Sequence, residues 1–474
     1  MGINRVDDVL GDGIERAVRA HHRRRLDRIG RVSALDPPAG GWAGTGSFVP
    51  RGGCSVELLV DGAEALPRMV DDVCAAESHV HVAGWYFTPG FTMGEGGPTL
   101  AALLGETAER IAVRVLAWAG APLPLFHPDR AEVRRIREEL VRGTRIEMEL
   151  DARERPMHCH HEKLVLVDDR VAYVGGIDLT SFAGDRCDTS DHDPRGRIGW
   201  HDVCLRLEGP VVADVAEHFR LRWPRGLPQA VRPEEVGATE AQLVRTVPER
   251  VYSGLPQGEF TILESYVRAL RSAARLVYLE SQFLWSSEIV SILSDKLRDP
   301  PSDDFRVVVL LPARPNNGGD DTRGQVGVLV DADKESGDET TRFLACTLYQ
   351  PGRGGELVYV HAKVGIVDDR WLTIGSANLN EHSLFNDTEV NVVVRDEELA
   401  RSTRLRLWSE HLGSDDVDGD PAAVVDELWR PIAERELERR RRKGYSEHRL
   451  VLLPHVSRRS QALLGPISGL FVDG

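Results

Sequence analysis

Two stretches of the sequence share one pattern and decide the fold: residues 161–179 read HEKLVLVDDRVAYVGGIDL, and residues 361–379 read HAKVGIVDDRWLTIGSANL. Each stretch has a His-x-Lys triplet, an apolar run, an Asp-Asp-Arg turn and a second apolar run, in that order. Short apolar runs bounded by turn signals are typical of buried strands. We therefore expect each stretch to form a buried β-hairpin, and the chain to contain an internal duplication.

Other blocks recur in the same order as these hairpins. Three pairs of apolar segments match: 78–87 with 274–283, 111–116 with 305–310, and 202–207 with 389–394. Segments with helical spacing lie between them, at 65–74, 130–141, 211–222, 262–274 and 397–411. Alternating strands and helices predict an α/β fold class, with two homologous domains of mixed sheets flanked by helices around one shared central cleft.

The domain boundaries follow from where the repeat begins and ends. We expect an N-terminal helical arm at 1–38, a first domain at 39–240 and a second domain with a C-terminal extension at 241–474. The arm contains the basic run 21–25, which predicts either a helix packed on the domain or a contact with anionic lipid. The basic run 439–443 predicts a charged exposed helix, and the acidic segment 316–338 predicts either a lid or a flexible loop.

Composition excludes several classes of protein. The chain has 474 residues, 41% hydrophobic and 28% charged, which is the balance of a globular protein. The net charge of −16 argues against a protein that coats nucleic acid, so no nucleic-acid partner is expected. Neither a membrane span nor a secretory signal is visible, and the six cysteines include no C-x-x-C pair. We expect a cytoplasmic protein that is able to touch a membrane surface.

The repeated triplets carry the candidate chemistry. Residues i and i+2 of a strand share a face, so His161 projects with Lys163, and His361 projects with Lys363. These are two of only five lysines in the chain, against 54 arginines. A neutral imidazole is a competent nucleophile toward phosphorus, and a protonated one can donate to the leaving oxygen. Two ammonium groups can stabilise the transition state, so we expect phosphodiester chemistry with no metal and no cofactor.

Supporting roles are assigned to residues around the triplets. A catalytic histidine needs its second ring nitrogen held, and we expect Asp202 to orient His161 and Glu389 to orient His361. Further candidates are grouped by role: phosphate binding for Asn378 and Ser376, turn formation for Asp168 and Asp368, and close approach of a ligand to the backbone at Gly175, Gly176 and Gly375. Asp178 replaces Asn378 in the first copy, so the two halves are not functionally identical.

Two competing interpretations of the histidines were weighed. A single histidine in such a strand is more often a core residue than a catalyst, but the recurrence of the same His and Lys offsets favours function. Zinc binding by the run 158–161 is the other alternative. His158 and His160 face away from His161 on a strand, and only Tyr359 and Val360 precede His361, so this alternative is disfavoured.

The pattern His-x-Lys-x4-Asp, followed by Gly-Gly or Gly-Ser, resembles the duplicated HKD motif of the phospholipase D superfamily. The resemblance extends through Glu280 and Gln282, through residues 200–202 and through residues 407–413, which look like the lipid-hydrolysing branch. It implies a monomer with two α/β sandwich domains around one cleft. It also implies metal-independent hydrolysis of a phospholipid such as phosphatidylcholine at a membrane surface, with water or an alcohol as acceptor.

The same resemblance implies that His161 is the nucleophile and His361 the general acid and base. His382 departs from the family pattern, in which arginine is common at this position. No appended membrane-targeting domain is evident, so calcium-dependent docking is not expected. Alternative functions are a cardiolipin-synthase-like phosphatidyltransferase, a nuclease-type phosphodiesterase, and a degenerate protein that binds lipid phosphate without chemistry.

Overall fold

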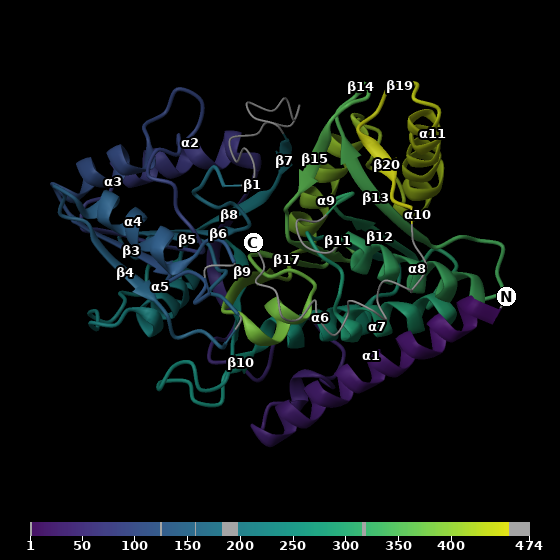
Figure 1. Ribbon diagram of the computed structural model, residues 1–474, viewed down its shortest axis with the longest axis horizontal. Coiled ribbons are helices and arrows are strands. Elements are labelled where there is room, and N and C mark those ends of the chain that lie inside the picture. The colour runs from purple at the N-terminus through teal and green to yellow at the C-terminus, as the bar shows by residue number, and fades with distance from the viewer. Residues whose placement is uncertain (1, 124–125, 157, 183–197, 315–318, 455–474) are drawn as a thin grey trace.

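The structure is a computed structural model that describes residues 2–123, 126–156, 158–182, 198–314 and 319–454 (Figure 1). Residues 455–474 of the predicted second domain, and Cys187, lie outside the described residues. Two sheets with helices on their outer faces lie side by side, and α1 (Gly2–Arg28) runs along one edge of the molecule.

The first half contains eight strands and four helices between residues 51 and 222. Its strands are β1 (Arg51–Val60), β2 (His79–Gly84), β3 (Ala112–Trp118), β4 (Glu147–Asp151), β5 (Leu164–Val167), β6 (Val171–Gly175), β7 (Gly199–His201) and β8 (Val203–Glu208). Its helices are α2 (Asp61–Cys74), α3 (Leu100–Ala108), α4 (Arg130–Val141) and α5 (Val211–Arg222). A short 3-10 turn, Val32–Ala34, follows α1.

The second half follows the same plan. Its strands are β9 (Thr239–Val247), β10 (Glu259–Phe260), β11 (Leu276–Glu280), β12 (Arg306–Leu310), β13 (Phe343–Tyr349), β14 (Gly352–Arg353), β15 (Leu357–Val360), β16 (Val364–Val367), β17 (Trp371–Gly375), β18 (Glu389–Val394), β19 (Tyr445–Ser446) and β20 (Leu450–Leu452). Its helices are α6 (Thr261–Ser272), α7 (Ser287–Arg298), α8 (Gly319–Glu335), α9 (Glu397–Leu412), α10 (Pro421–Val424) and α11 (Arg430–Arg441), with π-helical turns at His382–Asn386 and Val425–Trp429.

The two sheets have the same strand order, which confirms the predicted duplication and the α/β fold class. In the first half the order is β4-β3-β2-β5-β6-β8-β1, and in the second it is β13-β12-β11-β16-β17-β18-β9. The first three strands of each sheet are parallel and the others antiparallel. The sheets are joined where β1 pairs with β9 and where β7 pairs with β15.

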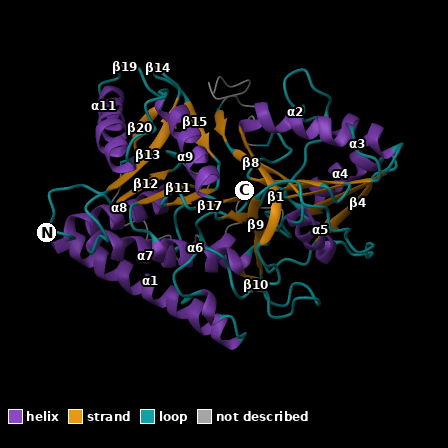
Figure 2. Cartoon of the chain, turned by 180° about the vertical axis from the view of Figure 1, so that it is seen from behind, coloured by secondary structure: helices purple, strands orange, loops and turns teal. Residues whose placement is uncertain are grey.

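Alternation along the strands builds three large cores. In β5, Leu164 and Leu166 face a core shared by both halves, whereas Val165 and Val167 face the core under α2, α3 and α4. The shared core also takes residues from α5 and α9, and the outer face of the second sheet packs on α6, α7 and α8. Figure 2 shows α1, α6 and α7 on one side of the second sheet and α11 on the other. The hairpins that carry the His-x-Lys triplets are thus fixed in the middle of the molecule.

The structure corrects one detail of the predicted repeat. The ladders pair Val80 with Val167 and Val277 with Val367, so Val80 corresponds to Val277. The matched segments 78–87 and 274–283 place Val80 opposite Leu276 instead, one residue out of register. Both segments are almost wholly apolar, so apolar pattern alone does not fix the register.

Residues before β1 pack on the second half. In α1, the buried His22 contacts Glu288 and Glu381, and Arg25 hydrogen-bonds Glu249. Further along, the backbone N–H of Gly44 donates to Glu264 (2.8 Å). These contacts fit the prediction of a helix packed on the domain. Within the described part of the chain, no helix is both long and apolar enough to cross a membrane.

Most of the described part of the acidic segment 316–338 is helical, so the prediction of a lid or a flexible loop is wrong there, and residues 316–318 lie outside the described residues. Residues 319–335 form α8, which packs along α7 on the outer face of the second sheet. The basic run 439–443 lies at the end of α11, where Arg442 pairs with Glu438 at i and i+4 (2.7 Å), as predicted.

Candidate active site

Symmetric backbone hydrogen bonds between the two halves position the two His-x-Lys triplets in the site. The backbone N–H of His161 donates to the carbonyl of Thr388 (2.9 Å), and that of His361 donates to the carbonyl of His201 (2.8 Å). Thr388 immediately precedes Glu389, and His201 immediately precedes Asp202. Each catalytic candidate therefore lies beside the other half's carboxylate: Glu389 is the first residue of β18, and Asp202 lies between β7 and β8.

The carboxylate partners are consequently crossed, and the predicted pairing is wrong. His161 Nδ1 lies 3.0 Å from Glu389 Oε1, and His361 Nδ1 lies 2.7 Å from Asp202 Oδ2. All four side chains are buried. The expectation that each histidine uses the carboxylate of its own half failed because the sheets exchange contacts at this edge. The exchange brings all four groups, from both halves, into one site.

The two lysines point into the same region. Lys163 Nζ donates to the carbonyl of His161 (2.8 Å) and lies 3.3 Å from Asp178 Oδ1. Lys363 Nζ donates to the carbonyl of His361 in the same way. Burial, outweighing the nearby carboxylate Asp202 and acting together with the charge of Lys163, lowers the pKa of Lys363 to about 7.

The environments of the two carboxylates differ. Glu389 accepts hydrogen bonds from the hydroxyls of Ser376 and Ser383, and burial raises its pKa well above the usual range. Asp202 Oδ1 accepts the backbone N–H of Val203 (2.8 Å), a contact that favours the ionised form.

The phosphate-binding roles of Asn378 and Ser376 stay predictions. Asn378 Nδ2 donates weakly to Gln282 Oε1 (3.4 Å), and its Oδ1 has no hydrogen-bond partner among the described residues. The hydroxyl hydrogen of Ser376 is shared between Glu389 and the carbonyl of Val390. In the first half, Asp178 replaces Asn378 and pairs with Lys163, so the halves differ as expected.

The packing of the protein itself requires these glycines, and their predicted role in the approach of a ligand stays a prediction. A Cβ on Gly176 would lie 2.1 Å from Asp202 Oδ1, and one on Gly375 would lie 2.3 Å from Asn391 Oδ1. A Cβ on Gly175 would meet the carbonyl of Val203 at 2.5 Å. These positions are glycine because the neighbouring strand and its side chains, including the Asp202 carboxylate, fill the space.

The turn aspartates are structural, as predicted. Asp168 accepts the backbone N–H groups of Glu77, Ser78 and His79 at 2.8–2.9 Å, and adopts a φ of 55°. Asp368 does the same for the three residues Ala274, Arg275 and Leu276, at 2.8 Å and with a φ of 54°. Each aspartate thereby fixes the start of the adjacent strand, β2 or β11.

The sequence analysis missed a buried polar network beneath His361. His201, whose carbonyl accepts the N–H of His361, places Nε2 at 2.8 Å from Glu280 Oε2. Glu280 also accepts from the hydroxyl of Tyr278 (2.6 Å) and contacts His411 (3.2 Å). Burial opposes protonation of His201, but Glu280 and Asp61 outweigh it and raise its pKa. The pattern Trp-His-Asp at 200–202 was the available signal.

The residues around the disfavoured zinc run face the second half. His158 Nδ1 lies 3.0 Å from His382 Nδ1, and His160 Nδ1 lies 2.9 Å from Thr388 Oγ1. The partners of His158 and His160, which are His382 and Thr388, therefore differ from Glu389, the partner of His161. His382, where the related pattern commonly has arginine, is buried in the contact with His158.

Fold and site together define a class: a duplicated α/β protein in which two buried histidine–carboxylate pairs and two lysines converge, an arrangement suited to displacement at phosphorus. Residues 266–408 match the family model described as "Cardiolipin synthase, PLD-like domain". The chain is 25% identical to Phospholipase D A of Dictyostelium discoideum and 26% identical to Phospholipase D1 of Schizosaccharomyces pombe. The alignments cover 77% and 58% of this chain, but only 36% and 29% of those proteins.

A solved structure has a similar fold. The phosphatidylserine synthase of Haemophilus influenzae Rd KW20 superimposes with a TM-score of 0.54 at 11% identity, over 76% of this chain and 86% of that one. At this identity the likeness concerns the fold alone. The family model and the sequence relatives support placing the chain in the phospholipase D superfamily.

Proposed function

We propose that this chain is a phospholipase D-type phosphodiesterase. It hydrolyses phospholipids such as phosphatidylcholine to phosphatidic acid and the free headgroup alcohol, through a covalent phosphohistidine. The observation that carries the proposal is the crossed pair of contacts, His161 with Glu389 and His361 with Asp202. Each contact holds Nδ1 and thereby orients Nε2 for reaction.

In the first step, His161 Nε2 attacks phosphorus and forms the N–P bond as the bond to the headgroup oxygen breaks. His361 Nε2 donates its proton to that departing oxygen, so the headgroup leaves as a neutral alcohol. Lys163 and Lys363 compensate the charge that develops on the nonbridging oxygens. We expect no metal ion to be required for this step.

In the second step, His361 removes a proton from water, and the resulting oxygen attacks phosphorus as the N–P bond to His161 breaks. The product is phosphatidic acid, and both histidines return to their starting protonation states. We keep the roles that the family resemblance implies, and the hydrogen bond from the backbone N–H of Val203 lets Asp202 support the imidazolium that the acid needs.

A phosphatidyltransferase is the second candidate, since an alcohol that replaces water in the second step gives transfer instead of hydrolysis. The match of residues 266–408 to a cardiolipin synthase domain favours it. Both activities need a phospholipid at a membrane surface. Because one chain carries both triplets, a monomer suffices, and the net charge of −16 disfavours a nucleic-acid substrate.

The test measures choline release from phosphatidylcholine vesicles in the presence of EDTA, with and without a primary alcohol. We expect activity in chelator, formation of the phosphatidyl ester with alcohol, and loss of both in His161→Ala and His361→Ala. His127→Ala, at an exposed histidine on the surface, is the matched control and keeps activity. Strict dependence on added metal would contradict the proposed mechanism. DNA cleavage that is lost in Lys163→Ala would support a nuclease instead.

A further inference from the structure

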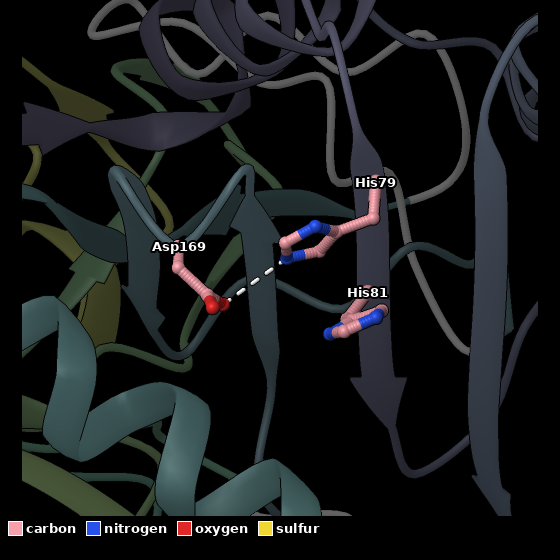
Figure 3. A group of neighbouring side chains, drawn as sticks. All are labelled: His79, His81 and Asp169. Atoms are coloured by element: carbon pink, nitrogen blue, oxygen red, sulfur yellow. Dashed lines mark hydrogen bonds and ion pairs between the residues drawn. The ribbon is translucent and has the colours of Figure 1, made fainter. Parts of the chain in front are cut away.

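A second group of histidines lies at the far end of β5 from His161 and Lys163. His79 and His81 are at i and i+2 of β2 and share a face, and Asp169 reaches toward them from the turn between β5 and β6 (Figure 3). His79 Nε2 lies 3.1 Å from Asp169 Oδ1, and one ligand atom from each of the three side chains lies within 4.8 Å of the others. Two imidazoles and a carboxylate form a donor set typical of zinc sites.

Hydrogen bonding fixes which nitrogen of His79 can bind an ion. The hydroxyl of Ser78 lies 2.9 Å from His79 Nδ1 and donates its only hydrogen to the Asp168 carboxylate (2.8 Å). The Ser78 oxygen must therefore accept a hydrogen from His79 Nδ1. His79 then presents Nε2 to Asp169, either with a proton or with a lone pair that a metal can take. A ligating histidine whose second N–H is held in this way is the usual arrangement in metal sites.

His81 is a neutral imidazole whose ring is held in place. Its ring stacks on Phe219 with a centroid separation of 4.7 Å. Arg114 Nη1 donates to His81 Nε2 (3.2 Å), and Arg114 Nη2 also faces Glu147 (3.4 Å). The positively charged Arg114 therefore occupies Nε2 of His81, a nitrogen that a metal ion would bind. When an ion binds there, the guanidinium of Arg114 can move toward the carboxylate of Glu147.

The duplication provides an internal comparison. The equivalent turn residue of the second half, Asp369, is neutralised by two hydrogen bonds of 2.7 Å from Arg404. The strand register places Leu276 and Tyr278 of β11 where β2 has His79 and His81. The first half therefore has two imidazoles and a carboxylate where the second half has an apolar side chain, a phenol and an Arg–Asp pair.

We propose that His79, His81 and Asp169 form a site for a divalent transition-metal ion of the zinc type, which displaces Arg114 from His81 when it binds. The side chains of His79 and Asp169 are 19% and 15% exposed, so an ion can reach them from solvent. Three protein ligands leave a coordination position for water. The site is separated from His161 by the length of β5, so the ion stabilises the first sheet and takes no part in the phosphodiester chemistry. The proposal is independent of the proposed function.

The test is calorimetric titration of the full chain, stripped with chelator, with Zn²⁺ alone. We expect Asp169→Asn and His79→Leu either to bind one equivalent of zinc fewer than the wild type or to bind that equivalent about 10–100-fold more weakly. Asparagine tolerates the φ of 51° at position 169, and leucine is the residue of the second half at position 79. Asp369→Asn is the matched control and keeps the full stoichiometry. Arg114→Gln removes the competing charge and binds zinc several-fold more tightly.

Thermal denaturation gives an independent readout, because an ion that binds only the folded state raises the melting temperature. We expect zinc to raise it for the wild type and for Asp369→Asn, and to raise it less for Asp169→Asn and His79→Leu. Equal stoichiometry, affinity and zinc-dependent stabilisation in all four proteins would overturn the proposal. An unchanged affinity in Arg114→Gln would overturn the exchange of Arg114 for the ion.

Discussion

His161 and Glu389 are 228 residues apart in the chain, yet His161 Nδ1 lies 3.0 Å from Glu389 Oε1. The symmetric contact, between His361 and Asp202, spans 159 residues. Each half thus holds the other half's histidine, and neither half has a complete site by itself. The complete site therefore depends on the contact between the two sheets.

The crossed contacts predict that the two carboxylates serve different steps. Asp202→Asn deprives His361 of the partner for its imidazolium, so protonation of the leaving group becomes slow. Glu389→Gln affects the nucleophile instead. We expect losses in kcat of about 10²–10⁴ in both, by analogy with other orienting carboxylates. The discriminating measurement is the rate with a p-nitrophenyl phosphodiester, whose leaving group needs no proton.

With that substrate, the release of p-nitrophenol in a single turnover should be largely restored in Asp202→Asn and should stay slow in Glu389→Gln. Two variants serve as controls. His361→Ala should behave like Asp202→Asn, and His161→Ala should behave like Glu389→Gln. The opposite correspondence, in which Asp202→Asn behaves like His161→Ala, would contradict the crossed pairing.

The lowered pKa of Lys363 predicts a dependence of stability on pH. Burial lowers this pKa from its ordinary 10.5 to about 7 in the folded chain, so the unfolded chain binds one more proton between these values. The contribution of Lys363 to the free energy of unfolding therefore rises with pH from about 7 to 10.5, with a slope of at most about 1.4 kcal/mol per pH unit. Chemical denaturation of the wild type and of Lys363→Met, at several pH values, measures the difference.

The wild type should gain stability relative to Lys363→Met as the pH rises across this window. Lys334→Met, at an exposed lysine outside the site, controls for the loss of a lysine in general. A constant difference between wild type and Lys363→Met from pH 7 to pH 10 would show that the Lys363 ammonium has an ordinary pKa in the folded chain.

Local patterns in the sequence were enough to predict several features of the structure. The hairpins of the two triplets, the five helical segments and the role of Asp168 and Asp368 followed from apolar spacing and turn residues. The crossed carboxylates did not, because a strand's own sequence does not say which sheet its edge will pair with. The sequence predicts a lid or a flexible loop at 316–338, although residues 319–335 form α8 against α7. In this segment, tertiary packing outweighs the glycine and aspartate content that argued against a helix.

The turn aspartates predict a loss of stability that leaves the chemistry intact. Asp168→Asn keeps a residue that tolerates a φ of 55°, but it loses the negative charge that receives three backbone N–H groups. Partial exposure of these bonds limits the cost to about 1–3 kcal/mol in the free energy of unfolding. Denaturation with urea measures it. Arg170→Ala, an exposed position in the same turn, is the control and should be within about 0.5 kcal/mol of the wild type.

Activity per folded molecule should be unchanged in Asp168→Asn, because Asp168 lies beyond the end of β5 opposite to His161. A large fall in kcat without a fall in stability would instead assign this aspartate to the chemistry.

The tight contact at Gly176 predicts that a single methyl group disables the acid. A Cβ there would lie 2.1 Å from Asp202 Oδ1, so in Gly176→Ala the carboxylate must move, and the 2.7 Å contact with His361 Nδ1 is lost. The second half has Ser376 at this position because its carboxylate is the longer Glu389, which reaches the serine hydroxyl as a hydrogen-bond acceptor. We therefore expect Gly176→Ala and Gly176→Ser to reproduce the leaving-group dependence of Asp202→Asn.

Gly13→Ala, in α1 with no atom within 4 Å of the added Cβ, is the control for a glycine substitution and keeps wild-type kinetics. Wild-type rates in Gly176→Ala with a natural phospholipid would mean that Asp202 acts without its contact to His361.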